Sequence, residues 1–370
     1  MRNHPGLAIV VSLAAACGAA EQTPAPASPP EIAAVAPDRV TDAVTDDPDD
    51  PALWMHPSDP ARSLIVATNK VQAPNGALVV FGLDGRARQT VAGIDRPNNV
   101  DIEQGVLLDG RAVDVAVTTE RLQHRLRVFA IDGERTDGRV LTEIGSVPVL
   151  AGEIGDFSEP MGIALYKRPS DGGLFAIVAP KLGPKVGYLW QYRVTGDGKG
   201  GVTGTLVRRF GHFSATGAAP GEPGEIEAIV VDDALGFVYY ADERHGIHKW
   251  HADPDHAQAA QELAVFGTEG YRLDREGLAL WTRPDGTGYL VSTDQIPGGS
   301  IFKLYRREGD QTGSHVHTVV AEAKTTADET DGLEATSVSL PGFSKGLVVA
   351  MNSGPKNFAL FSWERLFPNR

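Results

Sequence analysis

The sequence predicts an all-β fold, a six-bladed β-propeller, from three observations. A module consisting of a short strand with an acidic start and a hydrophobic β-hairpin recurs six times along the chain. The hairpins start roughly 50 to 60 residues apart, which is the spacing of propeller blades. Apolar and polar residues alternate throughout, whereas no stretch sustains a helical period. Six modules therefore predict six blades.

The hairpins supply the apolar centre of each predicted blade. The first strand of every hairpin is apolar and ends on a charged or amide side chain, and these strands are residues 64–70, 113–121, 174–181, 237–243, 289–294 and 347–352. A second apolar strand follows each of them after a short turn. Such alternating strands with short turns are typical of antiparallel sheets.

An acidic residue opens the strand upstream of each hairpin. The acidic residues are Asp49 with Asp50, Asp101, Glu159, Glu227, Glu276 and Asp331. If every blade places this strand against the central channel, the acids face one another at one end. Crowded carboxylates cannot all stay ionised unless cations bind among them. The pattern therefore predicts shared metal binding.

The hairpin loops bring further polar side chains to the same end. Lys70, Arg121 and Lys181 come from the first three blades, and the last three contribute Glu243, Asp294 and Asn352. Bound hard cations beside fixed lysine and arginine side chains favour an oxygen-rich polyanion. Phosphate is the first candidate ligand.

Composition and charge narrow the class of partner. The chain has 370 residues, of which 42% are hydrophobic, so it is long enough to bury a large core. A formal charge of −14 argues against nucleic acid as the partner. We expect a monomer that acts on a small molecule.

The amino terminus predicts export. Residues 1–20 combine Arg2 with an apolar run and read as a bacterial signal peptide, in which Cys17 is a candidate for lipid modification, with simple cleavage near Ala20 as the alternative. Residues 21–41 form a Pro/Ala-rich linker, and the propeller is expected over 42–370. The expected location is the periplasm or the outer membrane as a lipoprotein, alternatively the extracellular medium. Membrane association is expected only through Cys17.

Several segments and motifs are expected to be structural. Residues 196–224 are expected to form an outer hairpin with a long loop, and residues 251–261 are expected to form a short helix. Arg307 is expected to lie on an outer strand. Ser344 lies in a sequence that matches the nucleophile-elbow motif, but the helix that this motif requires does not follow. The glycines at 196, 198 and 201 match the dinucleotide-binding motif, but they lie between two expected strands and predict a turn. His315 and His317, and the histidines at 245, 248 and 251, predict solvated faces because no further ligand has diagnostic spacing.

Longer motifs resemble those of the β-propeller phytases, the alkaline calcium-dependent family. The resemblance begins with TDDPDDPALWMHPSDPARS, ATNK and NNVDI, and it continues through VTTER, VAPK, IEAIVVDD, ADE, DREGL, ETDG and NFALFSWERL. It covers about 42–366, nearly all of the expected domain. The combination of DDPALW with NNVDI is more specific than a single glycine motif.

This resemblance implies calcium-dependent hydrolysis of phosphate monoesters of phytate by a metal-activated water. The matching positions imply several calcium ions, with metal ligands at Asp49, Asp50, Glu227, Glu243, Asp274, Glu276 and Asp331. Glu227 would also lie close to the attacking water, and Lys70, Arg121 and Lys181 would be both phosphate-binding and catalytic. Hard calcium takes oxygen ligands and makes bound water easier to deprotonate.

The chain departs from the family pattern at a few positions. Val71 stands where the family often has a second lysine, and Met161 replaces a tyrosine near calcium. An expected aspartate aligns near Thr325, with Asp328 in a shifted position. The alternative function is a non-catalytic, metal-binding propeller that captures a phosphorylated ligand or partner. A lactonase-type propeller is disfavoured because a neutral ester has no use for three cations.

Overall fold

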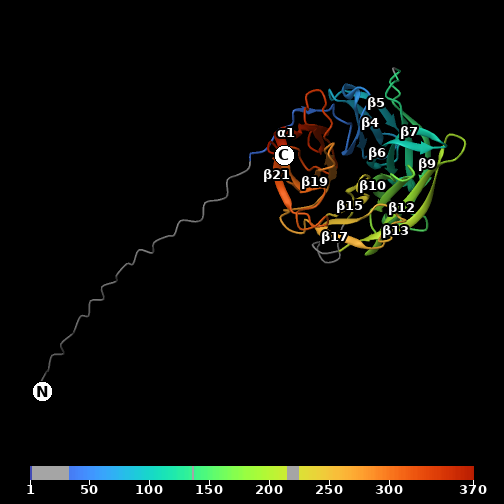
Figure 1. The fold of residues 1–370 in the computed structure, drawn as a ribbon. Coiled ribbons are helices and arrows are strands. Elements are labelled where there is room, and N and C mark those ends of the chain that lie inside the picture. Colours follow the sequence, from blue (N-terminus) through green and yellow to red (C-terminus); the bar gives the residue numbers. More distant parts are fainter. Residues whose placement is uncertain (2–32, 136, 215–224) are drawn as a thin grey trace. The chain divides into compact units, whose positions relative to one another are not determined.

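A ring of six four-stranded antiparallel sheets forms the fold, as Figure 1 shows for the computed structural model. The structure describes residues 1, 33–135, 137–214 and 225–370. The predicted all-β, six-bladed propeller is confirmed. The expectations for the signal peptide and Cys17, and those for most of the linker, lie outside the described residues.

Blades 1 to 3 each consist of four strands that follow one another in the sequence, innermost first. Blade 1 comprises β2 (Pro48–Trp54), β3 (Leu64–Asn69), β4 (Ala77–Gly82) and β5 (Ala87–Ala92). Blade 2 comprises β6 (Pro97–Leu108), β7 (Arg111–Glu120), β8 (Arg125–Ile131) and β9 (Leu141–Pro148). Blade 3 comprises β10 (Pro160–Lys167), β11 (Leu174–Pro180), β12 (Val186–Gly196) and β13 (Val202–His212).

Blades 4 and 5 repeat this order. Blade 4 comprises β14 (Ile229–Asp232), β15 (Phe237–Asp242), β16 (Gly246–His251) and β17 (Glu262–Phe266). Blade 5 comprises β18 (Leu278–Thr282), β19 (Gly288–Ile296), β20 (Gly299–Arg306) and β21 (Val319–Thr325). The described helical segments are short: η1 (Pro60–Arg62), η2 (Arg121–Gln123), η3 (Gly155–Ser158) and α1 (Trp363–Leu366).

Blade 6 closes the ring with strands from both ends of the domain. Its inner strands are β22 (Leu333–Thr336), β23 (Leu347–Asn352) and β24 (Asn357–Ser362), and its outer strand is β1 (Arg39–Val40). Arg39 pairs with Leu360 and Val40 with Ala359 in antiparallel register. The folded unit therefore takes in residues that the sequence assigned to the end of the linker, and the compact unit begins at Ala33.

Apolar side chains fill the spaces between neighbouring blades. The described core divides into six clusters, each formed by strands of two adjacent blades. Val128 of blade 2 and Ile163 of blade 3, for example, belong to one cluster. The middle strands β3, β4, β11, β23 and β24 are buried along their whole length, because side chains on both faces of a blade pack against neighbours. This packing holds the inner strands in a ring.

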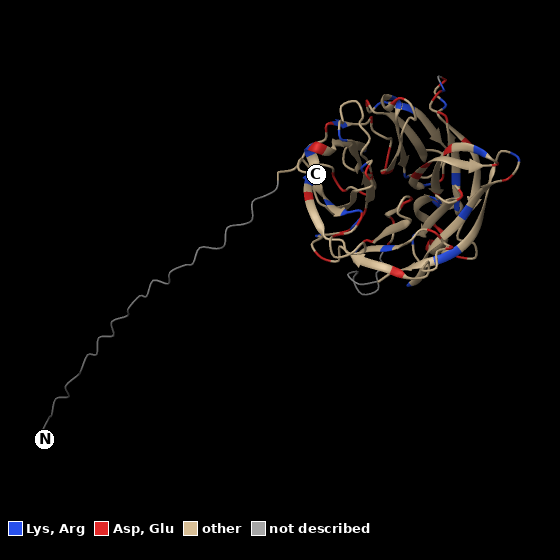
Figure 2. Cartoon of the chain, viewed as in Figure 1, with Lys and Arg blue, Asp and Glu red and all other residues tan. Residues whose placement is uncertain are grey.

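The inner strands surround a central channel. Consecutive inner strands contact one another from β2 to β22, and β22 returns to β2. Because each blade is antiparallel, the start of its innermost strand and the turn after its second strand lie at the same end of the channel. Figure 2 shows acidic segments around this channel.

Three expectations for outlying segments are wrong. The segment between β16 and β17 forms successive turns instead of a helix. Arg307 does not lie on an outer strand: it follows β20, the third strand of blade 5, and it is buried against Asp232 of blade 4. His248 and His317 are buried instead of solvated, with His248 Nδ1 2.5 Å from Glu262 and His317 Nε2 3.2 Å from the buried Lys249 Nζ.

Two further expectations are confirmed, those for the glycine motif and for Ser344. The glycines at 196, 198 and 201 lie in the hairpin that joins β12 and β13, and residues 215–224 of the predicted loop fall outside the described residues. Ser344 lies in a turn before β23, where its hydroxyl donates to Glu364. Within the described residues, the structure contains no helix with the length and hydrophobicity that a membrane crossing requires.

Candidate active site

Four of the predicted site residues occupy the same place in successive blades. Lys70, Arg121, Lys181 and Glu243 each follow directly after the second strand of their blade, at the ends of β3, β7, β11 and β15. The turn there must leave the sheet, so a long side chain can extend over the channel mouth. Four blades therefore deliver three cations and one acid to one end of the channel.

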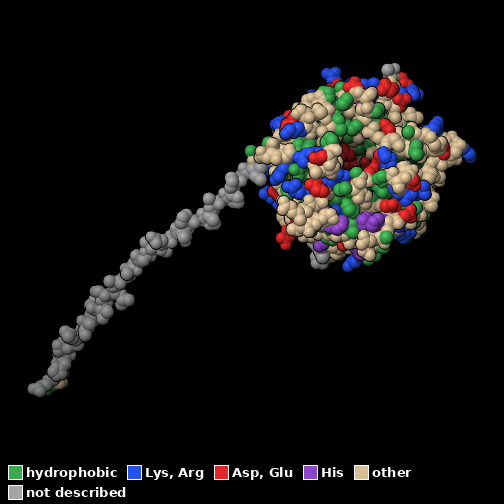
Figure 3. Space-filling model, in the orientation of Figure 1, with side chains coloured by type: hydrophobic (Ala, Val, Ile, Leu, Met, Phe, Trp, Pro, Cys, Tyr) green, Lys and Arg blue, Asp and Glu red, His purple; other side chains and the backbone are tan. Residues whose placement is uncertain are grey.

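Carboxylates from the starts of the inner strands meet these residues. Glu227 and Glu276 lie two residues before β14 and β18, and Asp331 lies two residues before β22. Together with Asp49, Glu225 and Glu243 we call them the rim carboxylates. In the space-filling view, acidic side chains occupy the central hollow (Figure 3).

Glu225, Glu227 and Glu243 form the tightest group among the rim carboxylates. One carboxylate oxygen from each lies within 4.8 Å of the others. Glu227 and Glu243 are buried, with 8% and 7% of their surface exposed, and within the described residues Glu243 Oε1 has no hydrogen-bond partner. Buried carboxylate oxygens without donors are the ligands that a hard cation takes.

Asp49 connects this group to Lys70 and Asp331. The fully buried Asp49 forms an ion pair with Lys70, whose ammonium also lies 3.8 Å from Asp331 Oδ2. Asp331 accepts a further hydrogen bond of 2.8 Å from Gln295. Lys70 is therefore held between acids of the first and last blades.

Burial and mutual repulsion raise the pKa values of four rim carboxylates. Burial first, and Asp49 second, raise the pKa of Glu227 to about 8. The same two causes raise the pKa of Asp331 to about 7. Burial raises the pKa of Glu243 well above its ordinary value, with Glu276 as the next cause. The pKa of Glu276 is raised in the same way, by burial and then by Asp331.

Lys70 shows the opposite effect. Burial opposes its charge, but Asp49, Glu227 and Asp331 together hold the pKa of Lys70 above its usual range. With pKa values of about 8 and 7, Glu227 and Asp331 thus retain protons near neutral pH when no positive charge is added, and cations would displace those protons. The donor set fits one or more hard divalent cations.

The other two cations are also held by acids. Arg121 is buried, its Nε donates to Glu159 at 2.7 Å, and its Nη1 donates to Asn98 at 3.2 Å. Lys181 Nζ lies 3.1 Å from Glu225. Asp274, at the edge of the group, lies 3.3 Å from Arg244. These pairs fix the cations in place without neutralising the excess of acid.

Asp50 lies apart from the rim. The register of β2 shifts between Pro48 and Pro51, and within this irregular segment Asp49 faces Lys70 while Asp50 lines the channel. Its Oδ2 accepts the Val100 N–H at 2.9 Å. Asp101, expected as the acidic start of the second blade, also lies in the channel, where it accepts the Leu165 N–H at 2.6 Å.

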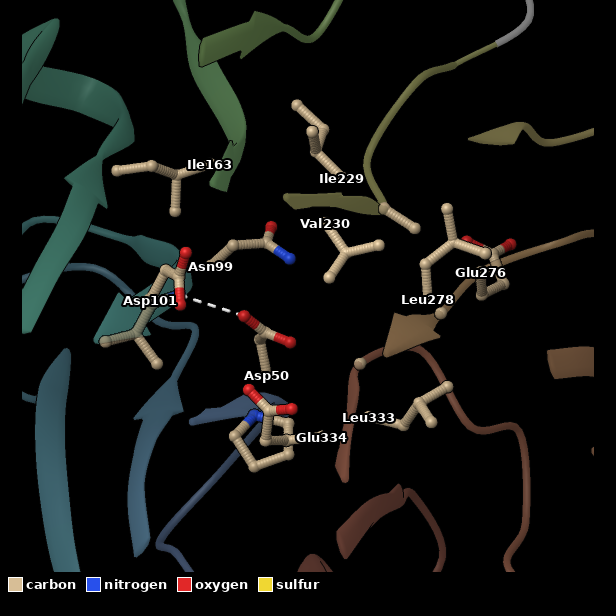
Figure 4. Close-up of a pocket in the computed structure, with 15 residues that line it drawn as sticks. Asp50, Asn99, Asp101, Ile163, Ile229, Val230, Glu276, Leu278, Leu333 and Glu334 are labelled. Carbon is tan, nitrogen blue, oxygen red and sulfur yellow. Dashed lines mark hydrogen bonds between the residues drawn. The ribbon is translucent and has the colours of Figure 1, made fainter. Parts of the chain in front are cut away.

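Asp50, Asp101 and Glu334 form a second acidic group, which we call the channel carboxylates (Figure 4). Burial raises the pKa of Asp101 to about 7, and burial with Asp101 nearby raises that of Glu334 to about 8. Asp50 has a pKa well above its ordinary value, mainly through burial. The acids predicted as one ring are thus divided between the rim and the channel, and Glu276 of the rim also lines the channel pocket.

Sequence reasoning missed three residues of these groups. Glu225 lies next to the IEAIVV motif, Glu334 follows the ETDG motif by two residues, and Asn98 begins the NNVDI motif. Asn98 is buried between Asp49, Glu227 and Arg121. Asn98 and Asn99 occupy the places in β6 that Asp49 and Asp50 occupy in β2, and this shared position is the signal that could have identified them.

Comparisons with known proteins agree with this fold and with this acidic site. A family model described as Phytase matches residues 6–366. The 3-phytase of Bacillus subtilis (strain 168) is 30% identical over 330 residues, which cover 86% of this chain and 80% of the relative. The chain therefore belongs to the phytase family and is a phytase enzyme.

Solved structures add no functional argument. The crystal structure of BBS1N in complex with ARL6DN, soaked with mercury, aligns with a TM-score of 0.47 at 10% identity, covering 85% of this chain and 79% of that chain. The same complex soaked with lead gives a TM-score of 0.43 at 10% identity, covering 80% of this chain and 73% of that chain.

Proposed function

We propose that this enzyme hydrolyses phosphate monoesters of phytate in a calcium-dependent reaction at the rim carboxylates. The observation that carries the proposal is the group of Glu225, Glu227 and Glu243, which each bring one carboxylate oxygen within 4.8 Å of the others, together with Glu243 Oε1, which has no hydrogen-bond partner among the described residues. The family membership supplies the substrate class, an inositol phosphate.

Calcium has a suitable donor set at the rim. Glu225, Glu227 and Glu243 would hold one ion, and Asp49, Glu276, Asp331 and Asp274 offer further oxygens around it. Calcium takes six to eight oxygen ligands in flexible geometry, which an all-carboxylate rim from several blades can provide. When bound, calcium supplies positive charge that polarises water and phosphate oxygens.

The side chains of the protein divide the remaining work. Glu227 is buried and basic for a carboxylate, so it can accept a proton from the attacking water. Lys70, Arg121 and Lys181 bind phosphate oxygens and stabilise the charge that accumulates on them in the transition state. Their acidic partners orient these cations before substrate arrives.

The excess of acid explains why metal and substrate would depend on each other. Phytate is a polyanion, and the negative charges of Glu225 and Glu243 would repel it. This repulsion would act against its binding to Lys181, which lies beside Glu225. Added divalent charge reverses the local field, so that the same mouth attracts phosphate.

Isothermal titration of calcium into chelator-treated protein tests the metal site. We expect wild-type protein to bind calcium and Glu243→Gln to bind at least about tenfold more weakly, because the variant loses a charged ligand. Asp285→Asn, in an exposed turn remote from the rim in the sequence, is the control. Equal calcium binding by the wild-type protein and by Glu243→Gln would contradict the assignment of this site.

A further inference from the structure

Asn98 lies at the junction between the acidic and the basic halves of the site. It is the second residue of β6 and is fully buried. Its Nδ2 donates to Glu227 Oε1 at 2.6 Å and to Asp49 Oδ2 at 3.1 Å, with Asn99 Oδ1 at 2.9 Å as a further acceptor, while its Oδ1 accepts from Arg121 Nη1 at 3.2 Å. One side chain thus joins groups from blades 1, 2 and 4.

The chemistry of the position selects a primary amide. An amide carries two N–H donors and a carbonyl acceptor on opposite edges, so it can donate to two carboxylates and accept from a guanidinium at once. A carboxylate here would face two like charges, and an apolar side chain would remove one hydrogen bond from each of the three partners. The contacts also fix the orientation of the amide, because only its nitrogen edge can face the acids.

We propose that Asn98 is a positioning residue, which holds Glu227 and Asp49 at a fixed distance from Arg121. This inference rests on the proposed function, in which Glu227 acts on the water side and Arg121 on the phosphate side. Asn98 contacts neither substrate nor reacting atoms in this account. Its hydrogen bonds set the distance between Glu227, which accepts the proton of the attacking water, and Arg121, which binds the phosphate group that this water attacks.

The role makes a specific kinetic prediction. Loss of an outer hydrogen bond to a metal-site ligand typically costs about 10 to 100-fold in activity or metal affinity. We expect Asn98→Ala to lower kcat on phytate by about 10 to 100-fold at saturating calcium, with KM changed by less than about threefold, because the binding cations remain. Calcium titration and thermal melting of the same variant show whether metal binding and folding persist.

Asn98→Asp supplies a readout that a merely structural role would not change. When protonated, the introduced carboxyl has one O–H donor and an acceptor, and when ionised it has no donor. The activity of Asn98→Asp relative to wild type should therefore recover in part as pH falls, because the protonated carboxyl supplies one of the two donors. This variant also keeps the size of the side chain, so it tests the proposal if Asn98→Ala does not fold.

Asn357→Ala is a matched control. Asn357 is another buried amide, at the start of β24, where it accepts a hydrogen bond from Asn352 at 2.9 Å. We expect its kcat to stay within about twofold of wild type.

The outcomes separate this inference from the proposed function. If wild-type activity does not depend on calcium, the proposed function is wrong. If wild-type activity depends on calcium but folded, calcium-loaded Asn98→Ala keeps a normal kcat, or Asn98→Asp shows the wild-type pH profile, the positioning role is overturned.

Discussion

Replacing Arg121 by alanine tests the phosphate-binding assignment. Arg121 is 5% exposed, and its guanidinium is held by Glu159 at 2.7 Å and Asn98 at 3.2 Å. A preorganised charged donor to the transition state contributes about 2 to 4 kcal/mol. At about 1.4 kcal/mol per tenfold, Arg121→Ala should lower kcat/KM on phytate by roughly 30 to 700-fold.

The same change also disturbs the fold locally, so stability must be measured beside activity. Glu159 loses its partner but is partly exposed to water, so we expect the free energy of unfolding to fall by only about 1 to 2 kcal/mol. Arg88→Ala is the control, since Arg88 lies on the outer strand β5 of blade 1, has a side chain that is 47% exposed, and pairs with Asp84 in the preceding turn. Equal, small effects of both variants on kcat/KM would refute a phosphate-binding role for Arg121.

Further predictions concern the role of Glu227 in catalysis, the stability of the fold and the dependence of that stability on calcium and pH. Glu227→Gln should lower kcat at least about a hundredfold in a phosphate-release assay while circular dichroism stays native, because the amide cannot accept the proton. Arg307→Met should lower the free energy of unfolding by about 3 to 5 kcal/mol in urea titrations. The variant leaves the buried carboxylate of Asp232 without its cation, since both of its oxygens lie 2.5 Å from the Arg307 guanidinium. Chelation should lower Tm at pH 7.5, because a ligand that binds only the native state stabilises it. In chelator, Tm should rise as pH falls from about 8 to 6.5, as buried Asp101 and Glu334 take up protons.

The sign of the pH effect follows from the direction of the shifts. Asp101 and Glu334 have folded-state pKa values of about 7 and 8, above those of the unfolded chain, so the folded protein binds more protons in this interval. Stability is then gained as pH falls and lost as pH rises. The lower limit is set by buried His317, whose pKa is lowered to about 4 and which therefore opposes folding in more acidic solution. A chelated protein whose Tm falls between pH 8 and 6.5 would contradict this account.

The fold could be predicted from the sequence because each blade repeats one local pattern. The expected hairpin strand at 64–70 corresponds to β3, and the one at 347–352 corresponds to β23, because an apolar run bounded by polar turns has one stable arrangement in a propeller. Closure could not be predicted in this way. Arg39 and Val40 are too short and too polar a segment to indicate a strand, and only pairing with β24 makes them one.

The site was predicted by type of residue more than by position. Lys70, Asp49, Glu227, Glu243, Glu276 and Asp331 do meet at one end, because the repeat fixes where their strands begin and end. The repeat does not show which way a side chain points. The sequence therefore does not distinguish Asp50, which lines the channel, from the acids at the rim. Neutral Asn98 was missed because a search for charge does not find a residue that orients charges. Burial of Arg307 depended on an acid in a neighbouring blade, far away in the sequence.

The most direct test of calcium-dependent catalysis is phosphate release from phytate by purified protein as free calcium is restored after chelation. We expect no turnover in excess chelator and recovery of activity as calcium returns, with the midpoint shifted to higher calcium in Glu243→Gln. Undiminished phosphate release in chelator would contradict the role of calcium. Calcium binding without phosphate release at any calcium concentration would contradict the assignment of catalysis to this rim.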